Sequence, residues 1–256
     1  MAAAQRLLSR PYRAPTAAFR VRTEDGVVLS GSRLGEGGPP LILCHGFLGW
    51  HRKRRVVDFA ERLARRFTVY AFDFRGHGDS GGVCTYGDLE VLDVAAVAAL
   101  ARAESGADPV TVGISMGGTA VLRHAALRGG VRAVVAISAP ARWDGHGSVA
   151  MRRILRLSGT RSGRAVARAV GYRLSDAWDP PATPEEVVDR ISPVPLIVVH
   201  GLDDHVFDVD EALRLYDRAE EPKRLMLCAR FGHAEDGLSA SFAERIAARI
   251  LDVIEE

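Results

Sequence analysis

Lysine and cysteine are both scarce in this chain. Its 256 residues include only Lys53 and Lys223 as lysines, so arginine supplies nearly all of the positive charge. The three cysteines are too few for a disulfide framework, and they favour a reducing compartment. The formal net charge is only +2, which gives no large positive surplus to attract nucleic acid. We therefore expect a cytoplasmic protein that does not bind nucleic acid.

Long apolar runs and metal-binding motifs are also missing. No apolar stretch reaches the roughly 18 residues that predict a membrane span, so we predict no transmembrane segment. The sequence has neither His-Glu-x-x-His nor paired Cys-x-x-Cys motifs, and we expect no metal and no cofactor. Residues 1–20 contain arginine but no acid, as organellar targeting peptides do. The alternative is an N-terminal extension without a targeting role.

Short apolar runs alternate with helical patterns along the chain. Asp25-Gly26, between segments 19–23 and 27–34, predicts a β-hairpin. Six continuous runs predict strands buried on both faces, at 41–46, 68–73, 110–115, 133–138, 196–201 and 224–229. Apolar residues at helical spacing predict helices at 56–67, 88–103, 116–128 and 239–254. This alternation predicts an α/β fold, a doubly wound and mostly parallel sheet, in a single domain of residues 1–256.

One gap between predicted strands is too long for a single crossover helix. About fifty residues separate the run at 133–138 from the run at 196–201, where one helix is usual. We predict that residues 141–190 form a helical cap inserted over the carboxyl ends of the strands, because this segment is too short for a large core of its own. Trp143 and Trp178 flank the cap, and we expect them either to line the substrate pocket or to anchor the cap.

Two segments are rich in basic residues, His51–Arg55 and Arg152–Arg173. The simplest interpretation is that each forms a solvated helix face. The alternative is that the arginines of the cap attract an anionic substrate or an anionic membrane surface.

Polar residues follow the predicted strands at the edge where ligands bind in this type of sheet. The segment Gly113-Ile114-Ser115-Met116-Gly117 joins the strand at 110–115 to the following helix. Glycines on either side of a serine permit a sharp turn that raises the hydroxyl above the sheet, next to a helix N-terminus that favours negative charge. Alone, the motif also fits a serine in an ordinary turn. An aspartate pair at 203–204 and His233 follow, and the order Ser, Asp, His is that of a triad on such a sheet.

Five motifs in this order resemble the α/β-hydrolase superfamily, and more narrowly its small bacterial serine esterases. They are CHGFLG, DFRGHGDSGG, GISMGG, HGLDDHVF and FGH, and the resemblance covers nearly the whole chain. It implies a cofactor-independent hydrolase that cleaves a small-molecule carboxylic ester of short or medium acyl chain through an acyl-enzyme on Ser115. The backbone N–H groups of Phe47 and Met116 are implied as its oxyanion hole.

The resemblance also implies partners for the serine. His233 would act as the general base, and the family's Gly-x-x-Asp spacing from Gly201 selects Asp204, in preference to Asp203, as the acid. A proline that usually follows the acid is absent, and Phe207 stands near its place.

Other interpretations of the same residues stay open. A thioesterase or an acyltransferase would use the same triad with another leaving group or acceptor, and a ligand-binding protein could keep the fold without turnover. His45 and His200 are interpreted as hydrogen-bonded histidines that shape turns, and His51 and His205 as surface or pocket-rim residues. The segment 76–81 matches a dinucleotide-binding pattern, but no helix follows directly, so we expect a structural loop. The sequence makes no prediction of the oligomeric state.

Overall fold

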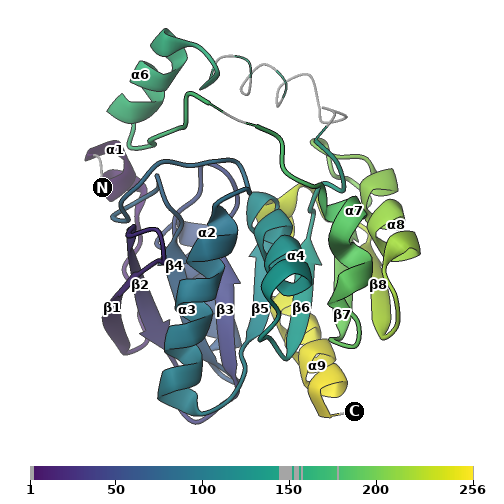
Figure 1. Ribbon diagram of the computed structural model, residues 1–256. Coiled ribbons are helices and arrows are strands. Elements are labelled where there is room, and N and C mark those ends of the chain that lie inside the picture. Colours follow the sequence, from purple (N-terminus) through teal and green to yellow (C-terminus); the bar gives the residue numbers. More distant parts are fainter. Residues whose placement is uncertain (1–2, 144–151, 153–155, 157, 178, 256) are drawn as a thin grey trace.

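One eight-stranded sheet runs through the middle of the protein (Figure 1). The computed structural model describes residues 3–143, 152, 156, 158–177 and 179–255. The strands lie in the order β1-β2-β4-β3-β5-β6-β7-β8. Their bounds are β1 Thr16–Arg22, β2 Val28–Leu34, β3 Pro40–Cys44, β4 Thr68–Asp73, β5 Val110–Ile114, β6 Ala133–Ile137, β7 Leu196–Gly201 and β8 Lys223–Cys228.

The strand directions confirm the predicted sheet. β2 is antiparallel to β1 and β4, and the neighbouring pairs from β4 through β8 are parallel. The hairpin closes at Gly26, whose φ of +88° explains why glycine follows Asp25 there. Every residue of β3, β5, β6 and β7 is buried, so these strands read in the sequence as continuous apolar runs. The prediction that the run at 224–229 is buried on both faces is wrong, because β8 is an edge strand and only Cys228 in it is buried.

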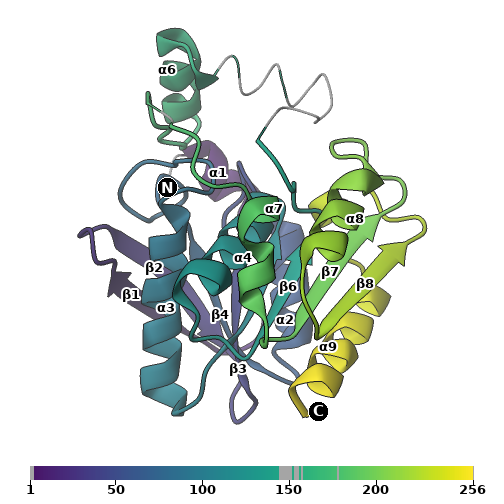
Figure 2. The same cartoon turned by 45° about the vertical axis from the view of Figure 1, so that its right-hand side comes forward.

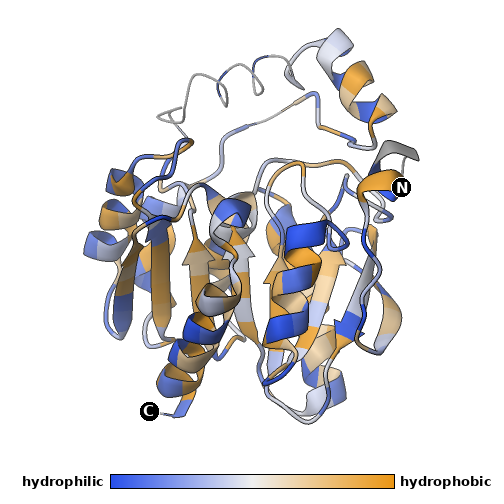
Figure 3. Ribbon diagram, turned by 180° about the vertical axis from the view of Figure 1, so that it is seen from behind, coloured by the Kyte–Doolittle hydropathy of each residue, from blue (hydrophilic) through white to orange (hydrophobic). Residues whose placement is uncertain are grey.

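Helices cover both faces of the sheet (Figures 1 and 2). One core lies between the sheet and α3, α4 and α8, and the other lies between the sheet and α2 and α9. Seen from behind, the strands are mostly apolar and the outer helix faces are polar (Figure 3). The bounds are α1 Ala3–Leu8, α2 Arg54–Leu63, α3 Glu90–Ser105, α4 Met116–Arg128, α6 Arg161–Ala169, α7 Pro184–Val187, η1 Val188–Ile191, α8 Val209–Arg218, η2 Ala234–Gly237 and α9 Ala240–Glu255.

Described residues between β6 and β7 lie over the carboxyl ends of the strands (Figure 1). α6 lies above this edge, whereas α7 and η1 pack against α4. The indole N–H of Trp143 donates to the Pro181 carbonyl at 2.5 Å, which joins the two ends of the segment. Part of the predicted cap at 141–190, including Trp178, lies outside the described residues, so the cap stays a prediction.

Candidate active site

Ser115 stands in a strained turn between β5 and α4. Its φ of 52° and ψ of −117° form a backbone conformation that few residues other than glycine adopt. A Cβ atom on Gly113 would lie 2.2 Å from the Gly117 carbonyl oxygen, and one on Gly117 would lie 2.5 Å from the Cys44 carbonyl oxygen. The two glycines therefore let α4 approach β5 and the end of β3 more closely than any side chain would permit.

His233 and Asp204 reach the same point from other loops. The Nε2 atom of His233 lies 3.1 Å from the Ser115 hydroxyl oxygen, and its Nδ1 atom lies 2.9 Å from Oδ2 of Asp204. Asp204 follows β7, and His233 lies between β8 and η2. Its neighbour Asp203 is exposed to solvent, whereas the Asp204 side chain is only 1% exposed. The structure therefore brings the three predicted side chains into one hydrogen-bonded chain.

The surroundings of Asp204 keep its carboxylate ionised. Burial alone would raise its pKa, but the hydrogen bond and charge of His233, together with the N–H groups of Val206 and Phe207, lower the pKa below its usual value. These two N–H groups donate to Oδ1 at 2.8 and 3.0 Å. An ionised carboxylate at this place accepts the Nδ1–H of His233 and leaves Nε2 free to accept a proton from the serine hydroxyl.

The loop after β3 supplies a backbone donor beside the serine. A Cβ atom on Gly46 would lie 3.3 Å from the Ser115 Cβ, so the backbone that leads to Phe47 runs next to the serine. Met116 is the first residue of α4, where a helix leaves N–H groups unpaired. Within the described part of the chain, neither the Phe47 N–H nor the Met116 N–H donates a hydrogen bond. Both amides can therefore donate to an oxyanion at this position.

A buried neutral histidine fixes this loop. The Nδ1–H of His45 donates to the Gly46 carbonyl at 2.8 Å, and its Nε2 accepts the N–H of Phe74 at 3.0 Å. Burial and the nearby His77 lower the pKa of His45 to about 3. These bonds occupy both ring nitrogens, which confirms that His45 shapes the turn.

Two polar residues support the site in ways that sequence reasoning missed. Ser138, at the end of β6, accepts the N–H of Ala234 at 3.1 Å and so holds the residue after His233. His200, predicted only to shape a turn, has its Nε2 atom 3.2 Å from the Phe207 carbonyl oxygen and 3.8 Å from Oδ2 of Asp204. The only sequence signal for either residue is its position at a strand end, which many residues share.

The prediction that His51 lies at the surface or the pocket rim is wrong. Its side chain is buried, and its Nδ1 atom lies 2.7 Å from Oδ1 of Asp73, a carboxylate at the end of β4. A buried ionised carboxylate needs such a partner, and the sequence does not show which histidine it takes. His205 is exposed as predicted, with its ring centroid 6.4 Å from that of His233.

The first basic segment is partly neutralised beside the site. Lys53 lies 3.0 Å from Glu235, and Arg55 lies 2.9 Å from Asp236. Both acids belong to η2, which begins directly after His233. These exposed or half-buried pairs tie the histidine loop to the start of α2.

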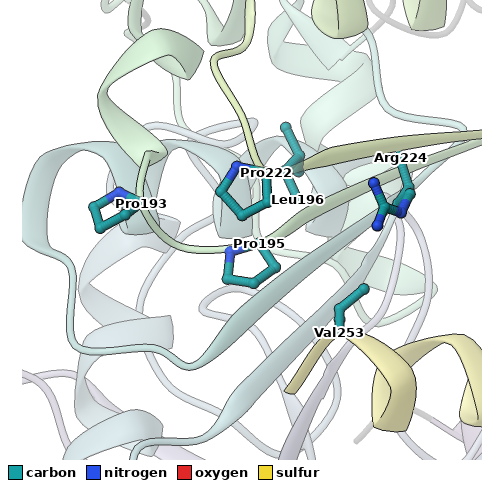
Figure 4. A pocket seen from close by; sticks show the side chains of 6 residues that line it. All are labelled: Pro193, Pro195, Leu196, Pro222, Arg224 and Val253. Carbon is teal, nitrogen blue, oxygen red and sulfur yellow. The ribbon is translucent and has the colours of Figure 1, made fainter. Parts of the chain in front are cut away.

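A pocket of about 290 Å³ lies away from these residues, at the amino-terminal ends of β7 and β8 (Figure 4). Its lining comes from the segments that precede β7 and β8 and from the end of α9: Pro193, Pro195, Leu196, Pro222, Arg224 and Val253. In sheets of this kind ligands bind at the carboxyl ends of the strands, so we assign this pocket no part in the site.

The described residues hold no group of three or more His, Cys, Asp or Glu side chains that could bind a metal ion. None of their helices is both long enough and apolar enough to cross a membrane.

The buried histidines predict a measurable dependence of stability on pH. Burial is the main cause that lowers the pKa of His124, in α4, from 6.5 to about 4, and it acts in the same way on His45. Below pH 6.5 the unfolded chain binds protons at these residues that the folded chain does not, so acid favours unfolding. From pH 7 to pH 5 each histidine should remove about 2 kcal/mol from the free energy of unfolding.

Denaturant titrations of His124→Gln at pH 7 and pH 5 measure this effect. Asp93, whose pKa burial raises to about 7, acts in the opposite direction, so each variant is compared with wild type. His124→Gln should reduce the loss between the two pH values by about 2 kcal/mol. The exposed His205→Gln serves as the control and should change nothing. An unchanged loss in His124→Gln would contradict the argument.

Comparisons with known proteins show the family and the fold. A model of the alpha/beta hydrolase family matches residues 41–256. The protein YfhR of Escherichia coli K12 is 31% identical over 168 residues, which cover 64% of this chain and 52% of YfhR, so the chain spans about half the length of that relative. The esterase Pf2001 of Pyrococcus furiosus superimposes on this chain with a TM-score of 0.69 at 24% identity. The superposition covers 94% of this chain and 92% of the Pf2001 chain.

The esterase RhEst1 of Rhodococcus sp. ECU1013 superimposes on this chain with a TM-score of 0.72 at 21% identity. The superposition covers 93% of this chain and 98% of the RhEst1 chain. Identities this low show a shared fold and no more. The family model, in contrast, covers every strand of the parallel part of the sheet except the first residue of β3, and the segments that carry Ser115, Asp204 and His233. This chain belongs to the alpha/beta hydrolase family.

Proposed function

We propose that this protein is a serine hydrolase that cleaves carboxylic esters through an acyl-enzyme on Ser115. The observation that carries the proposal is the continuous hydrogen-bonded chain from the Ser115 hydroxyl through His233 to a buried carboxylate. The strained turn supports it, because strain of this kind persists where a side chain must be held in one position. Two of the similar solved structures are described as esterases, which agrees with this choice.

The geometry supports the following steps. His233 takes the hydroxyl proton at Nε2 while the Ser115 oxygen attacks the ester carbonyl carbon. The N–H groups of Phe47 and Met116 donate to the oxygen that becomes negative, and Asp204 stabilises the imidazolium. His233 then gives its proton to the departing alcohol. A water molecule then attacks the acyl carbon while His233 takes a proton from it. The bond from that carbon to the Ser115 oxygen breaks, His233 gives the proton to this oxygen, and the acid departs with the serine hydroxyl restored.

A fluorophosphonate, which phosphonylates an activated serine and stays attached, tests the nucleophile directly. We expect one phosphonyl group per folded chain, on the peptide that contains Ser115, and none on heat-denatured protein. Intact mass and peptide mapping measure the product. Attachment at another serine, or to folded and denatured chains alike, would contradict the proposal.

The leaving group is tested separately. Nothing in the site favours a thioester over a simple ester, or another acyl acceptor over water. Rates on a p-nitrophenyl ester and on a coenzyme A thioester of the same acyl chain therefore decide between the two leaving groups. A protein that is labelled by the fluorophosphonate but turns over neither ester would be a binding protein with an inactive triad.

A further inference from the structure

The second basic segment differs from other charged parts of the surface. From residue 145 to residue 175 the sequence contains seven arginines and no acidic residue. Arg161 and Arg168, both exposed on α6, have no acid within ion-pair distance in the described part of the chain. Some exposed arginines elsewhere do pair with acids, as Arg128 does with Glu24 and Arg249 does with Asp252. α6 therefore presents charge that no acid among the described residues neutralises.

Apolar side chains on α6 and at its C-cap are in contact with solvent. Val166 is 66% exposed and Val170 is 42% exposed, and no residue of α6 is fully buried. A helix with separate apolar and charged faces normally packs its apolar face against the core. In α6 this face is left partly in water, which is typical of a surface that binds another molecule.

α1 extends this surface. Leu7 is 87% exposed and Leu8 is 67% exposed. The side-chain amide of Gln5 donates to the Gly171 carbonyl just after α6 at 3.3 Å, and both views place α1 directly below α6 (Figures 1 and 2). Seen from behind, apolar stretches mark both helices (Figure 3). We call this surface the α1/α6 face and define it by Leu7, Leu8, Arg161, Val166, Arg168 and Val170.

α1 and α6 lie above the carboxyl ends of the strands (Figure 1), and Ser115 directly follows β5 at that end of the sheet. The chain that follows α6 contacts the loop after β3 that contains Phe47, because the Tyr172 hydroxyl donates to the Leu48 carbonyl at 2.7 Å. Leu48 is the neighbour of Phe47. A large body that binds this face would therefore sit at the edge of the sheet where Ser115 lies.

We propose that the α1/α6 face docks on an anionic phospholipid bilayer. Arginines without acidic partners match the negative headgroups, and the exposed leucines and valines match the boundary between headgroups and acyl chains. A nucleic acid would satisfy the arginines but would leave the apolar side chains in water. Docking in this orientation turns the Ser115 edge of the protein toward the lipid. The inference is independent of ester hydrolysis, because lipid binding is measured without turnover.

Sedimentation with lipid vesicles tests the docking. The full chain should bind vesicles of phosphatidylcholine mixed with phosphatidylglycerol, bind pure phosphatidylcholine poorly, and be released by high salt. Each arginine near an anionic surface contributes roughly a fivefold gain in partitioning, so Arg161→Glu with Arg168→Glu should lower binding by roughly 25-fold or more. Leu7→Ser with Val166→Ser leaves the charge unchanged and should lower binding by roughly tenfold.

The matched control is Arg218→Glu with Arg249→Glu, which makes the same change of charge on α8 and α9, and it should bind nearly as wild type does. The proposal is overturned if wild type does not sediment with the anionic vesicles, if the control loses as much binding as the α6 variant, or if the serine variant binds unchanged. Competition by double-stranded DNA that removes all binding of the wild type at equal phosphate concentration would assign the face to nucleic acid instead.

Discussion

Replacing Ser115 by alanine is expected to lower kcat for p-nitrophenyl esters by about 10⁴- to 10⁶-fold. The substitution removes the oxygen that lies 3.1 Å from His233 and leaves the rest of the site in place. The remaining rate would come from the oxyanion donors and from binding, which still accelerate attack by water. The measurement is a series of esters from acetate to palmitate, with wild type and variant at equal concentration.

Ser241→Ala is the matched control, because Ser241 is exposed on α9 and its hydroxyl lies 3.1 Å from that of Ser239, which is not a triad residue. It should keep the wild-type rate. Thermal unfolding of Ser115→Ala should stay close to that of wild type, which separates loss of chemistry from loss of folding. If Ser115→Ala cleaves the esters as fast as wild type does, Ser115 is not the nucleophile. If wild type is active, the acyl chain with the highest kcat/KM reports the chain length that the site accepts best.

The parts of the site that the sequence predicts are those set by local geometry. Glycines on either side of Ser115 are needed wherever a helix must approach a strand this closely, so the turn is visible as a pattern. Continuous apolar runs reveal β3 and β5 to β7 because both faces of a parallel sheet are covered. The choice of Asp204 over Asp203, in contrast, comes from the resemblance, through the family's Gly-x-x-Asp spacing from Gly201.

Contacts between distant segments could not be predicted in the same way. Ser138 meets Ala234 across 96 residues, a contact that exists because β6 and the loop after β8 end at the same edge of the sheet. His51 meets Asp73 because β4 and the loop after β3 are neighbours in the strand order, whereas the sequence offers several histidines for one carboxylate. Such partners follow from strand order, which a single sequence does not display.

Replacing Asp204 by asparagine is expected to lower kcat by about 10⁴-fold without unfolding the protein. Asparagine has the size of aspartate, but its amide can donate to Nδ1 of His233. A ring that accepts at Nδ1 carries its proton on Nε2, the nitrogen that must receive the proton of Ser115. The loss therefore falls on kcat rather than on KM, because ester binding does not depend on the tautomer. Steady-state kinetics of Asp204→Asn, and of Asp203→Asn as its control, measure this loss of kcat.

Asp203→Asn makes the same change of charge one residue away and should alter kcat by no more than about twofold, because an exposed carboxylate is screened by water. The comparison removes any general effect of net charge and leaves the effect of the hydrogen bond at 2.9 Å. Equal losses in the two variants would mean that the loop, and not the Asp204 carboxylate, sets the rate. A loss confined to Asp203→Asn would mean that the exposed Asp203, and not Asp204, is the acid of the triad. A loss confined to Asp204→Asn would mean that His233 must be held in one tautomer for Ser115 to react.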